Sequence, residues 1–181
     1  MVDTAKIVFL DIDGVLNSLS SVLALGNPNK CLDPVCVGLV ARLLKEAGAK
    51  VVVSSSWRIG RTVKELQNEL DGIGAGRIAD HIIGRTGDGY NGHRGRQIKE
   101  WIEANAPDCS YIILDDDSDM LPAQKPYFVK TNFDEGFRAS HYRKAMGLLN
   151  PQHADSKIIT MAEFKPDIAA VSTTTSREGK E

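Results

Sequence analysis

A short apolar run that ends on two aspartates constrains the fold of this 181-residue chain more than any other feature. Residues 7–10 read Ile-Val-Phe-Leu, and Asp11, Ile12, Asp13 and Gly14 follow them. A run of this length is typical of a buried strand. Because side chains alternate along a strand, Asp11 and Asp13 leave its carboxyl end on the same face, and Gly14 permits a sharp turn there. Two carboxylates about 4 Å apart repel by roughly 4 kcal/mol at an effective dielectric constant near 20. The pattern therefore predicts a bound cation or one carboxyl that works as an acid, with an ordinary polar turn as the alternative.

A second apolar run has the same design and weakens that alternative. Residues 111–114 read Tyr-Ile-Ile-Leu and precede a stretch that holds four aspartates in five residues, namely Asp115, Asp116, Asp117 and Asp119. Local hydrogen bonds cannot neutralise four such carboxylates, and a solvated acidic loop rarely follows an apolar strand twice in one chain. Mg²⁺ is the cation that we expect, because it prefers oxygen ligands.

A third apolar run, 49–53, ends on hydroxyl groups instead of acids. Ser54 stands where the acids stand on the other two strands, and Ser55 follows it. A hydroxyl and the backbone N–H groups after it suit a phosphate oxygen, since they donate hydrogen bonds without adding charge. A serine-rich turn is the alternative reading of this segment.

A glycine-rich basic loop, residues 84–96, precedes a helix that we expect from Gln97 to about Asn105. The loop carries Arg85, Arg94 and Arg96. Arg94 or Arg96, at the helix start, can reach an anion near that terminus. Solvated arginines in a mobile loop are the alternative for at least one of the three.

Strands and helices are expected to alternate along the chain, which predicts a parallel sheet covered by helices on both faces, an α/β three-layer sandwich. Active sites of such folds lie at the carboxyl ends of the strands, where the segments above have been placed. The expected strands are 7–10, 49–53, 81–83, 111–114 and 127–130. The expected helices are 34–47 (with Asp33 as N-cap and Gly48 closing it), 62–70, 97–105 and 137–149.

These motifs, in this order, resemble those of the haloacid dehalogenase (HAD) superfamily over roughly residues 6–149. Asp11-Ile12-Asp13-Gly14 resembles its first motif, Ser54 its second, Arg94 the Lys or Arg of its third, and the acidic run 115–119 its fourth. More narrowly, the phrases at 14–17, 54–58 and 113–120 are similar to the HAD domain of Swiss Army Knife RNA repair proteins, which occurs in bacteria and phages. One departure is Val15, which stands where the first motif usually has Thr, and the three consecutive aspartates leave the register of the fourth motif open.

The resemblance implies a Rossmann-like fold and a Mg²⁺-dependent phosphatase. Asp11 would attack phosphorus to form an aspartyl-phosphate, while Asp13 would act as general acid and then as general base. Ser54, Ser55 and Arg94 would bind the phosphate. The expected metal ligands are Asp11, the main-chain carbonyl of Asp13, and acids from the fourth motif: Asp116 or Asp115, with Asp119 as a further candidate.

The substrate class stays open at this stage. Few residues are left over for a cap domain, and a minimal or absent cap leaves an open site. An open site favours a large substrate, such as an RNA or DNA 3′- or 5′-phosphate end or a phosphoprotein, or else an oligomer that supplies a lid. A 5′-nucleotidase or other small-molecule phosphatase is the alternative, and a non-catalytic phosphate- or metal-binding regulatory module is the alternative from another class. Five Lys or Arg against two Asp lie between residues 77 and 99, although the net charge of −2 excludes a basic surface overall.

Length and composition are ordinary for one domain, which we expect over residues 1–165, followed by a disordered tail over 166–181 rich in Thr, Ser and charged residues. The three cysteines, Cys31, Cys36 and Cys109, have no CxxC spacing and indicate neither a disulfide framework nor a zinc site. The four scattered histidines are interpreted as ordinary core or surface residues. With no long apolar leader, we expect a cytoplasmic protein without a membrane anchor. The sequence predicts no oligomeric state.

Overall fold

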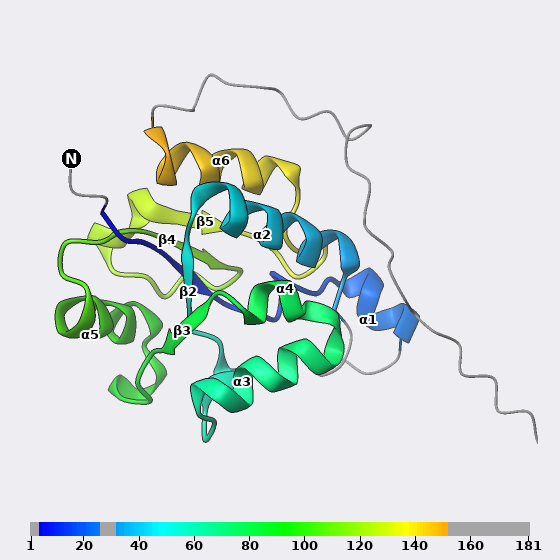
Figure 1. Ribbon diagram of the computed structural model, residues 1–181, viewed down its shortest axis with the longest axis horizontal. Helices are drawn as coiled ribbons and strands as arrows, with labels where there is room; N and C mark the ends of the chain where they lie inside the picture. The colour runs from blue at the N-terminus through cyan, green and yellow to red at the C-terminus, as the bar shows by residue number, and fades with distance from the viewer. Residues whose placement is uncertain (1–3, 26–31, 152–181) are drawn as a thin grey trace, which may run out of the picture.

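A computed structural model describes residues 4–25 and 32–151, and at its centre lies a five-stranded parallel sheet (Figure 1). The strand order is β3-β2-β1-β4-β5, and every neighbouring pair is parallel. The strands are β1 (Lys6–Leu10), β2 (Lys50–Val53), β3 (Ile82–Arg85), β4 (Ser110–Asp115) and β5 (Phe128–Lys130). The predicted α/β architecture with a central parallel sheet is confirmed.

Helices cover both faces of this sheet. The longer ones are α2 (Pro34–Ala47), α3 (Val63–Leu70), α5 (Arg94–Asn105) and α6 (Ala139–Leu149). The shorter ones are α1 (Leu19–Leu25) and α4 (Gly76–Ala79), with turns of other helical types at η2 (Ser56–Arg58), η3 (Asp71–Ala75), η4 (Tyr90–Gly92) and η5 (Pro122–Tyr127). Figure 1 shows α2 and α6 side by side over one face, with α5 on the other.

The alternation of side chains along β1 divides the core between these two faces. Val8 and Leu10 belong to the larger apolar cluster, which contains residues of α2, α3, α4 and α6. Ile7 and Phe9 belong to the smaller cluster, with Ile98 of α5. Since side chains two residues apart share a face, the side chain that follows Ile7 and Phe9 in this series, Asp11, extends the α5 face beyond the end of the strand.

Local capping explains the start and end of α2 and the start of α3, which lie at or within one residue of the predicted positions. The Asp33 carboxylate accepts the Val35 N–H at 2.8 Å, and Gly48 closes α2 with φ +66°, a left-handed conformation that favours glycine. At α3, the Thr62 hydroxyl accepts the Glu65 N–H while the Glu65 carboxylate accepts the Thr62 N–H, a reciprocal capping box.

The structure differs from the predicted elements at several ends. Helix α5 begins at Arg94, three residues before the predicted start, and β3 covers 82–85 where 81–83 was expected. The last helix begins at Ala139, two residues later than expected. The short helices α1 and α4 were not predicted, because seven and four residues give too little periodicity to recognise.

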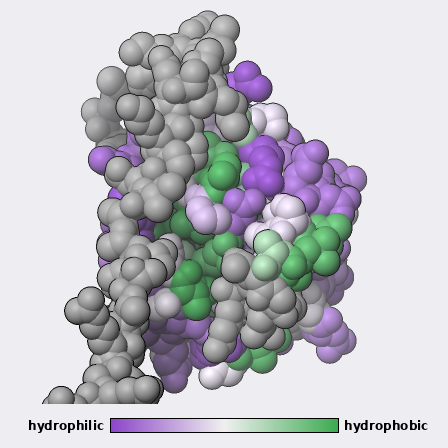
Figure 2. Space-filling view, turned by 90° about the vertical axis from the view of Figure 1, so that its right-hand side faces the viewer, coloured by the Kyte–Doolittle hydropathy of each residue, from purple (hydrophilic) through white to green (hydrophobic). Residues whose placement is uncertain are grey.

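Residues 11–33 connect β1 to α2, and the described part of this connection contains α1. Helix α1 exposes apolar side chains, with Leu23 76% and Leu19 40% exposed. Figure 2 views this side of the molecule and shows hydrophobic and hydrophilic side chains interspersed on it. The predicted domain boundary at 165 and the predicted tail 166–181 lie outside the described residues, as do Cys31 and His153. Within the described ranges, every helix is too short or too polar to cross a membrane.

Candidate active site

Four polar residues stand side by side at the carboxyl edge of the sheet. The strand register pairs Leu10 with both Val53 and Leu114, and Val53 with Arg85. The next residue on each strand therefore forms the row Thr86, Ser54, Asp11, Asp115. Backbone hydrogen bonds extend the ladder through this row: the N–H groups of Asp11, Ser54 and Thr86 donate to Leu114, Leu10 and Val53 at 2.9 to 3.0 Å.

Three carboxylates gather in the middle of this row. One oxygen of each of Asp11, Asp115 and Asp116 lies within 4.8 Å of the others, a grouping that could hold a metal ion. Asp115 is fully buried and Asp11 is 5% exposed. The backbone passes close to the cluster at Gly14, where φ is +70° and an added Cβ would lie 2.4 Å from the Asp116 carboxylate.

Arg94, the first residue of α5, contacts the same cluster. Its Nη1 lies 2.6 Å from Asp11 Oδ2 and also pairs with Asp115 Oδ2. Burial opposes the charge on Arg94, but the carboxylates of Asp11 and Asp115 outweigh it and raise the pKa of Arg94. Arg96, the alternative candidate, is exposed. The structure thus places Arg94 against the carboxylates.

Burial and the mutual repulsion of the acids perturb their protonation. Burial, and next the negative charge of Asp11, raise the pKa of Asp115 to about 7 although Arg94 opposes the shift. The same two causes raise the pKa of Asp116. Three ionised carboxylates and one guanidinium sum to a charge of −2 (−3 + 1), which one divalent cation would balance.

Magnesium fits this donor set. All three acidic ligand atoms are carboxylate oxygens, which Mg²⁺ prefers, and it usually keeps several waters instead of filling its coordination shell with protein groups. The other oxygen of Asp115, Oδ1, does not pair with Arg94. It accepts the Asp117 N–H at 2.9 Å, which fixes the orientation of that carboxylate.

The hydroxyl groups of the row are buried without partners. Among the described residues, Ser54 Oγ and Thr86 Oγ1 have no hydrogen-bond partner, and neither does Thr131 Oγ1, which follows β5 at the same edge. A buried hydroxyl that makes no hydrogen bond costs about 1–3 kcal/mol. An anion at this edge would accept hydrogen bonds from Ser54 and Thr86 and remove that cost.

Ser55 and Arg58 hold the turn that follows Ser54. The Ser55 hydroxyl accepts the Trp57 N–H at 3.3 Å and thereby caps η2. Arg58 is 4% exposed and donates to the carbonyls of Ser54, Ser55 and Gly87 and to Gln97 Oε1. Burial lowers the pKa of Arg58, Asp88 opposes the shift, and the nearby charge of Arg94 adds to it. Arg58 therefore ties the serine turn to the basic loop and to α5.

Asp13 and Asp119, the remaining predicted site residues, lie outside the carboxylate cluster. The Asp13 carboxylate accepts hydrogen bonds from Asn17 Nδ2 at 2.8 Å and from Trp57 Nε1 at 3.0 Å. The Asp119 carboxylate accepts the Arg94 N–H at 2.9 Å and so caps α5 from a distant segment. This contact explains why the helix begins at Arg94 and why Arg94 stands over the cluster.

Four residues of the site had no role predicted from the sequence: Asn17, Trp57, Arg58 and Thr86. The placement of β3 at 81–83 concealed Thr86, because that shorter strand left it within the basic loop. Trp57 and Arg58 lie in the segment 54–58 that is similar to the HAD domain of Swiss Army Knife RNA repair proteins, but that similarity predicted no role for either residue. A signal for Thr86 was available: like Ser54, it is a hydroxyl residue directly after a strand.

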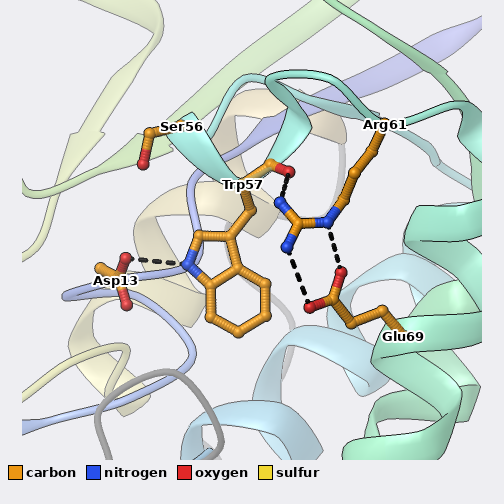
Figure 3. A pocket seen from close by; sticks show the side chains of 5 residues that line it. All are labelled: Asp13, Ser56, Trp57, Arg61 and Glu69. Carbon is orange, nitrogen blue, oxygen red and sulfur yellow. Dashed lines mark hydrogen bonds and ion pairs between the residues drawn. The ribbon is translucent and has the colours of Figure 1, made fainter.

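A cavity of about 270 Å³ opens beside Asp13 (Figure 3). Asp13, Ser56, Trp57, Arg61 and Glu69 line it. Arg61 pairs with Glu69 at 2.7 Å and donates to the Trp57 carbonyl at 2.7 Å. Of the predicted site residues, Asp13 lines this cavity, whereas Asp11, Asp115, Asp116 and Arg94 do not.

Comparison with known proteins identifies the family to which this chain belongs. The family model described as "HAD domain in Swiss Army Knife RNA repair proteins" matches residues 7–142. This range contains the acidic cluster, Arg94 and the serine turn. No curated protein matches the chain, and no solved structure matches it.

Proposed function

The chain belongs to the family of HAD domains in Swiss Army Knife RNA repair proteins, and we propose that it is a Mg²⁺-dependent phosphomonoester hydrolase. Membership of this family indicates a phosphatase-type function. The observation that carries the proposal is the row at the carboxyl edge of the sheet. It sets the buried carboxylates of Asp11 and Asp115 beside the unpartnered hydroxyl of Ser54, with Arg94 over them. One edge thus offers a nucleophile, cation ligands and anion donors.

Asp11 is the proposed nucleophile. Its Oδ1 accepts the Ile12 N–H at 2.8 Å, so one oxygen is fixed while Oδ2 faces Arg94. An oxygen of Asp11 would form a bond to phosphorus as the bond from phosphorus to the leaving oxygen breaks. Water would then attack the aspartyl-phosphate and release inorganic phosphate and the free carboxylate.

Arg94 and the hydroxyls serve the phosphoryl group. Arg94 can transfer its donors from Asp11 to the phosphate oxygens, and Ser54 can donate the hydrogen bond that it does not otherwise make. Thr86 extends the same row of donors. Such preorganised donors stabilise the charge that spreads over the equatorial oxygens in the transition state.

The proposed side-chain ligands of Mg²⁺ are Asp11, Asp115 and Asp116. The main-chain carbonyl of Asp13 is the proposed backbone ligand. When bound, Mg²⁺ would neutralise the excess negative charge of the cluster and polarise the phosphoryl oxygens. Asp119 stays a predicted ligand; the contact of its carboxylate with the Arg94 N–H would have to open first.

We propose phosphorylated RNA or DNA ends as the substrate class. The printed family description refers to RNA repair proteins, and the described part of the connection between β1 and α2 adds only a seven-residue helix over the site. A site without a large cover admits the end of a polymer. Free nucleotides and other small phosphomonoesters are the alternative substrates.

The test is phosphate release by the wild type on oligonucleotides with 3′- or 5′-phosphate ends, on free nucleotides and on an aryl phosphate, with and without Mg²⁺. The Asp11→Asn variant should lose turnover. Asp108→Asn should keep it, because Asp108 is exposed and precedes β4 at the opposite edge of the sheet. Release that persists in Asp11→Asn would refute the assigned nucleophile. Binding without any turnover in the wild type would favour a non-catalytic phosphate- or metal-binding module.

A further inference from the structure

Two donors hold the Asp13 carboxylate from opposite ends. Asn17 Nδ2 donates to Oδ1 at 2.8 Å. Trp57 Nε1 donates to Oδ2 at 3.0 Å, as Figure 3 shows. An indole nitrogen carries a hydrogen that it can only donate, so this contact has one possible direction. Each carboxyl oxygen has two lone-pair positions. The two contacts therefore orient Asp13 and leave it free to carry or accept one proton.

Both donors are themselves immobilised. Asn17 is fully buried, and its Oδ1 accepts the Gly14 N–H at 2.7 Å. Trp57 is 8% exposed and belongs to the larger apolar cluster. Its carbonyl accepts a hydrogen bond from Arg61, which the ion pair with Glu69 holds in turn. The indole N–H is thus a rigid support, delivered by the turn that also carries Ser54.

The supported carboxyl lines a cavity that could hold a leaving group. Asp13 lines the cavity of about 270 Å³ together with Ser56 and Trp57. Asp13 follows the proposed nucleophile, Asp11, by two residues. In an in-line displacement the leaving oxygen departs from the side of phosphorus opposite to the attacking oxygen of Asp11. This arrangement suits proton transfer to the leaving oxygen.

We propose that Trp57 is a positioning residue that holds the general acid and base Asp13 through its indole N–H. The inference rests on the proposed phosphatase function. As the bond from phosphorus to the leaving oxygen breaks, the Asp13 O–H proton passes to that oxygen. When water attacks the aspartyl-phosphate, the Asp13 carboxylate takes a proton from the water and the bond from phosphorus to Asp11 breaks.

Substrates that differ in leaving group provide the test. A primary or secondary alkoxide needs the proton, whereas an activated aryl oxide leaves without it. General acid catalysis is worth about 10²–10⁴-fold, so Trp57→Phe should lower kcat/KM at least about 10-fold on an oligonucleotide phosphate and less than about 3-fold on an aryl phosphate. Equal losses on both substrates would indicate a structural role and overturn the proposal.

A double-mutant cycle and a matched control sharpen this test. With Asp13→Ala already present, Trp57→Phe should lower the remaining rate on the oligonucleotide by less than about 2-fold, since the two residues act as one unit. Independent, multiplicative losses would contradict the assigned role. Trp101→Phe makes the same chemical change at the other tryptophan, whose ring packs on Phe9 in the α5 layer at 5.6 Å, and should affect both substrates equally.

The hydrogen bond can be observed apart from catalysis. The chain has two tryptophans, so its nitrogen–proton correlation spectrum contains two indole signals, and Trp101→Phe assigns them. The Trp57 signal should shift in Asp13→Ala. An unmoved signal would refute the contact and the positioning role with it. A shifted signal in a protein that releases no phosphate from any substrate would keep the contact but refute the proposed function, and the catalytic role of Trp57 would fall with that function.

Discussion

The charge balance of the carboxylate cluster predicts an inverted dependence of stability on pH in the absence of Mg²⁺. The pKa of Asp115 is raised from 3.8 to about 7 by burial and by Asp11. In the unfolded chain this carboxyl loses its proton near pH 4, whereas in the folded protein it keeps the proton up to about pH 7. Between these values the folded state binds more protons. The free energy of unfolding from this group therefore falls as pH rises.

The magnitude follows from the same two pKa values. A difference of one pH unit corresponds to about 1.4 kcal/mol, so the shift of Asp115 is worth on the order of 4 kcal/mol between pH 4 and pH 8. Because Asp11 and Asp116 repel Asp115 and titrate together with it, part of this free energy belongs to the group and not to Asp115 alone. We therefore expect a change of at least about 2 kcal/mol. Mg²⁺ should remove the loss, because binding to the ionised carboxylates stabilises the folded state by about 2.7 kcal/mol at 100 times its Kd.

Urea unfolding from pH 5 to pH 8, with a chelator or with Mg²⁺, measures this effect, and Asp115→Asn is the matched control. His141 contributes the opposite slope in this range, because burial lowers its pKa and stability from this group then rises with pH. The informative quantity is therefore the stability of Asp115→Asn minus that of the wild type. Without metal it should grow by about 2–3 kcal/mol from pH 5 to pH 8, and with Mg²⁺ the growth should shrink or reverse. A difference independent of pH would refute the reasoning.

Three further predictions concern the surroundings of the cluster. Gly14→Ala should weaken Mg²⁺ binding at least about 10-fold in calorimetric titration, since its Cβ would lie 2.4 Å from the Asp116 carboxylate and φ is +70°. Arg58→Met should lower the free energy of unfolding by about 3 kcal/mol and lower kcat/KM, because it leaves buried carbonyls unpaired; Arg42→Met, at an exposed ion pair, should cost under about 1 kcal/mol. Thr62→Ala removes the capping box of α3 and should cost about 1 kcal/mol in urea unfolding while leaving Mg²⁺-dependent turnover unchanged.

The elements that the sequence predicted are those whose signals are local. The apolar runs before Asp11, Ser54 and Asp115 identified three central strands, and the Asp33 and Gly48 caps identified α2. In a parallel sheet the carboxyl ends of the strands meet at one edge. Recognising three strand ends was therefore enough to predict which side chains share that edge.

The parts that the sequence did not predict depend on contacts between distant segments. The start of α5 is decided by the Asp119 carboxylate, 25 residues after the Arg94 N–H that it accepts. Of the two donors that orient Asp13, Trp57 is 44 residues away. Periodicity and turn chemistry carry no information on such pairs, because both describe neighbours within about four residues.

The division of labour between the aspartates illustrates this limit. Asp11 and Asp13 share a face in an ideal strand, and from that geometry a cation between the two side chains was one reading. The strand ends at Leu10, however, and Gly14 turns the chain with a positive φ, so the Asp13 carboxyl reaches Trp57 while Asp11 stays in the row with Asp115. The Asp13 carboxylate thus lies outside the group of three that could share one cation. The repulsion between carboxylates is strong among Asp11, Asp115 and Asp116, where burial adds to it, and a cation bound there gains the most from neutralising it.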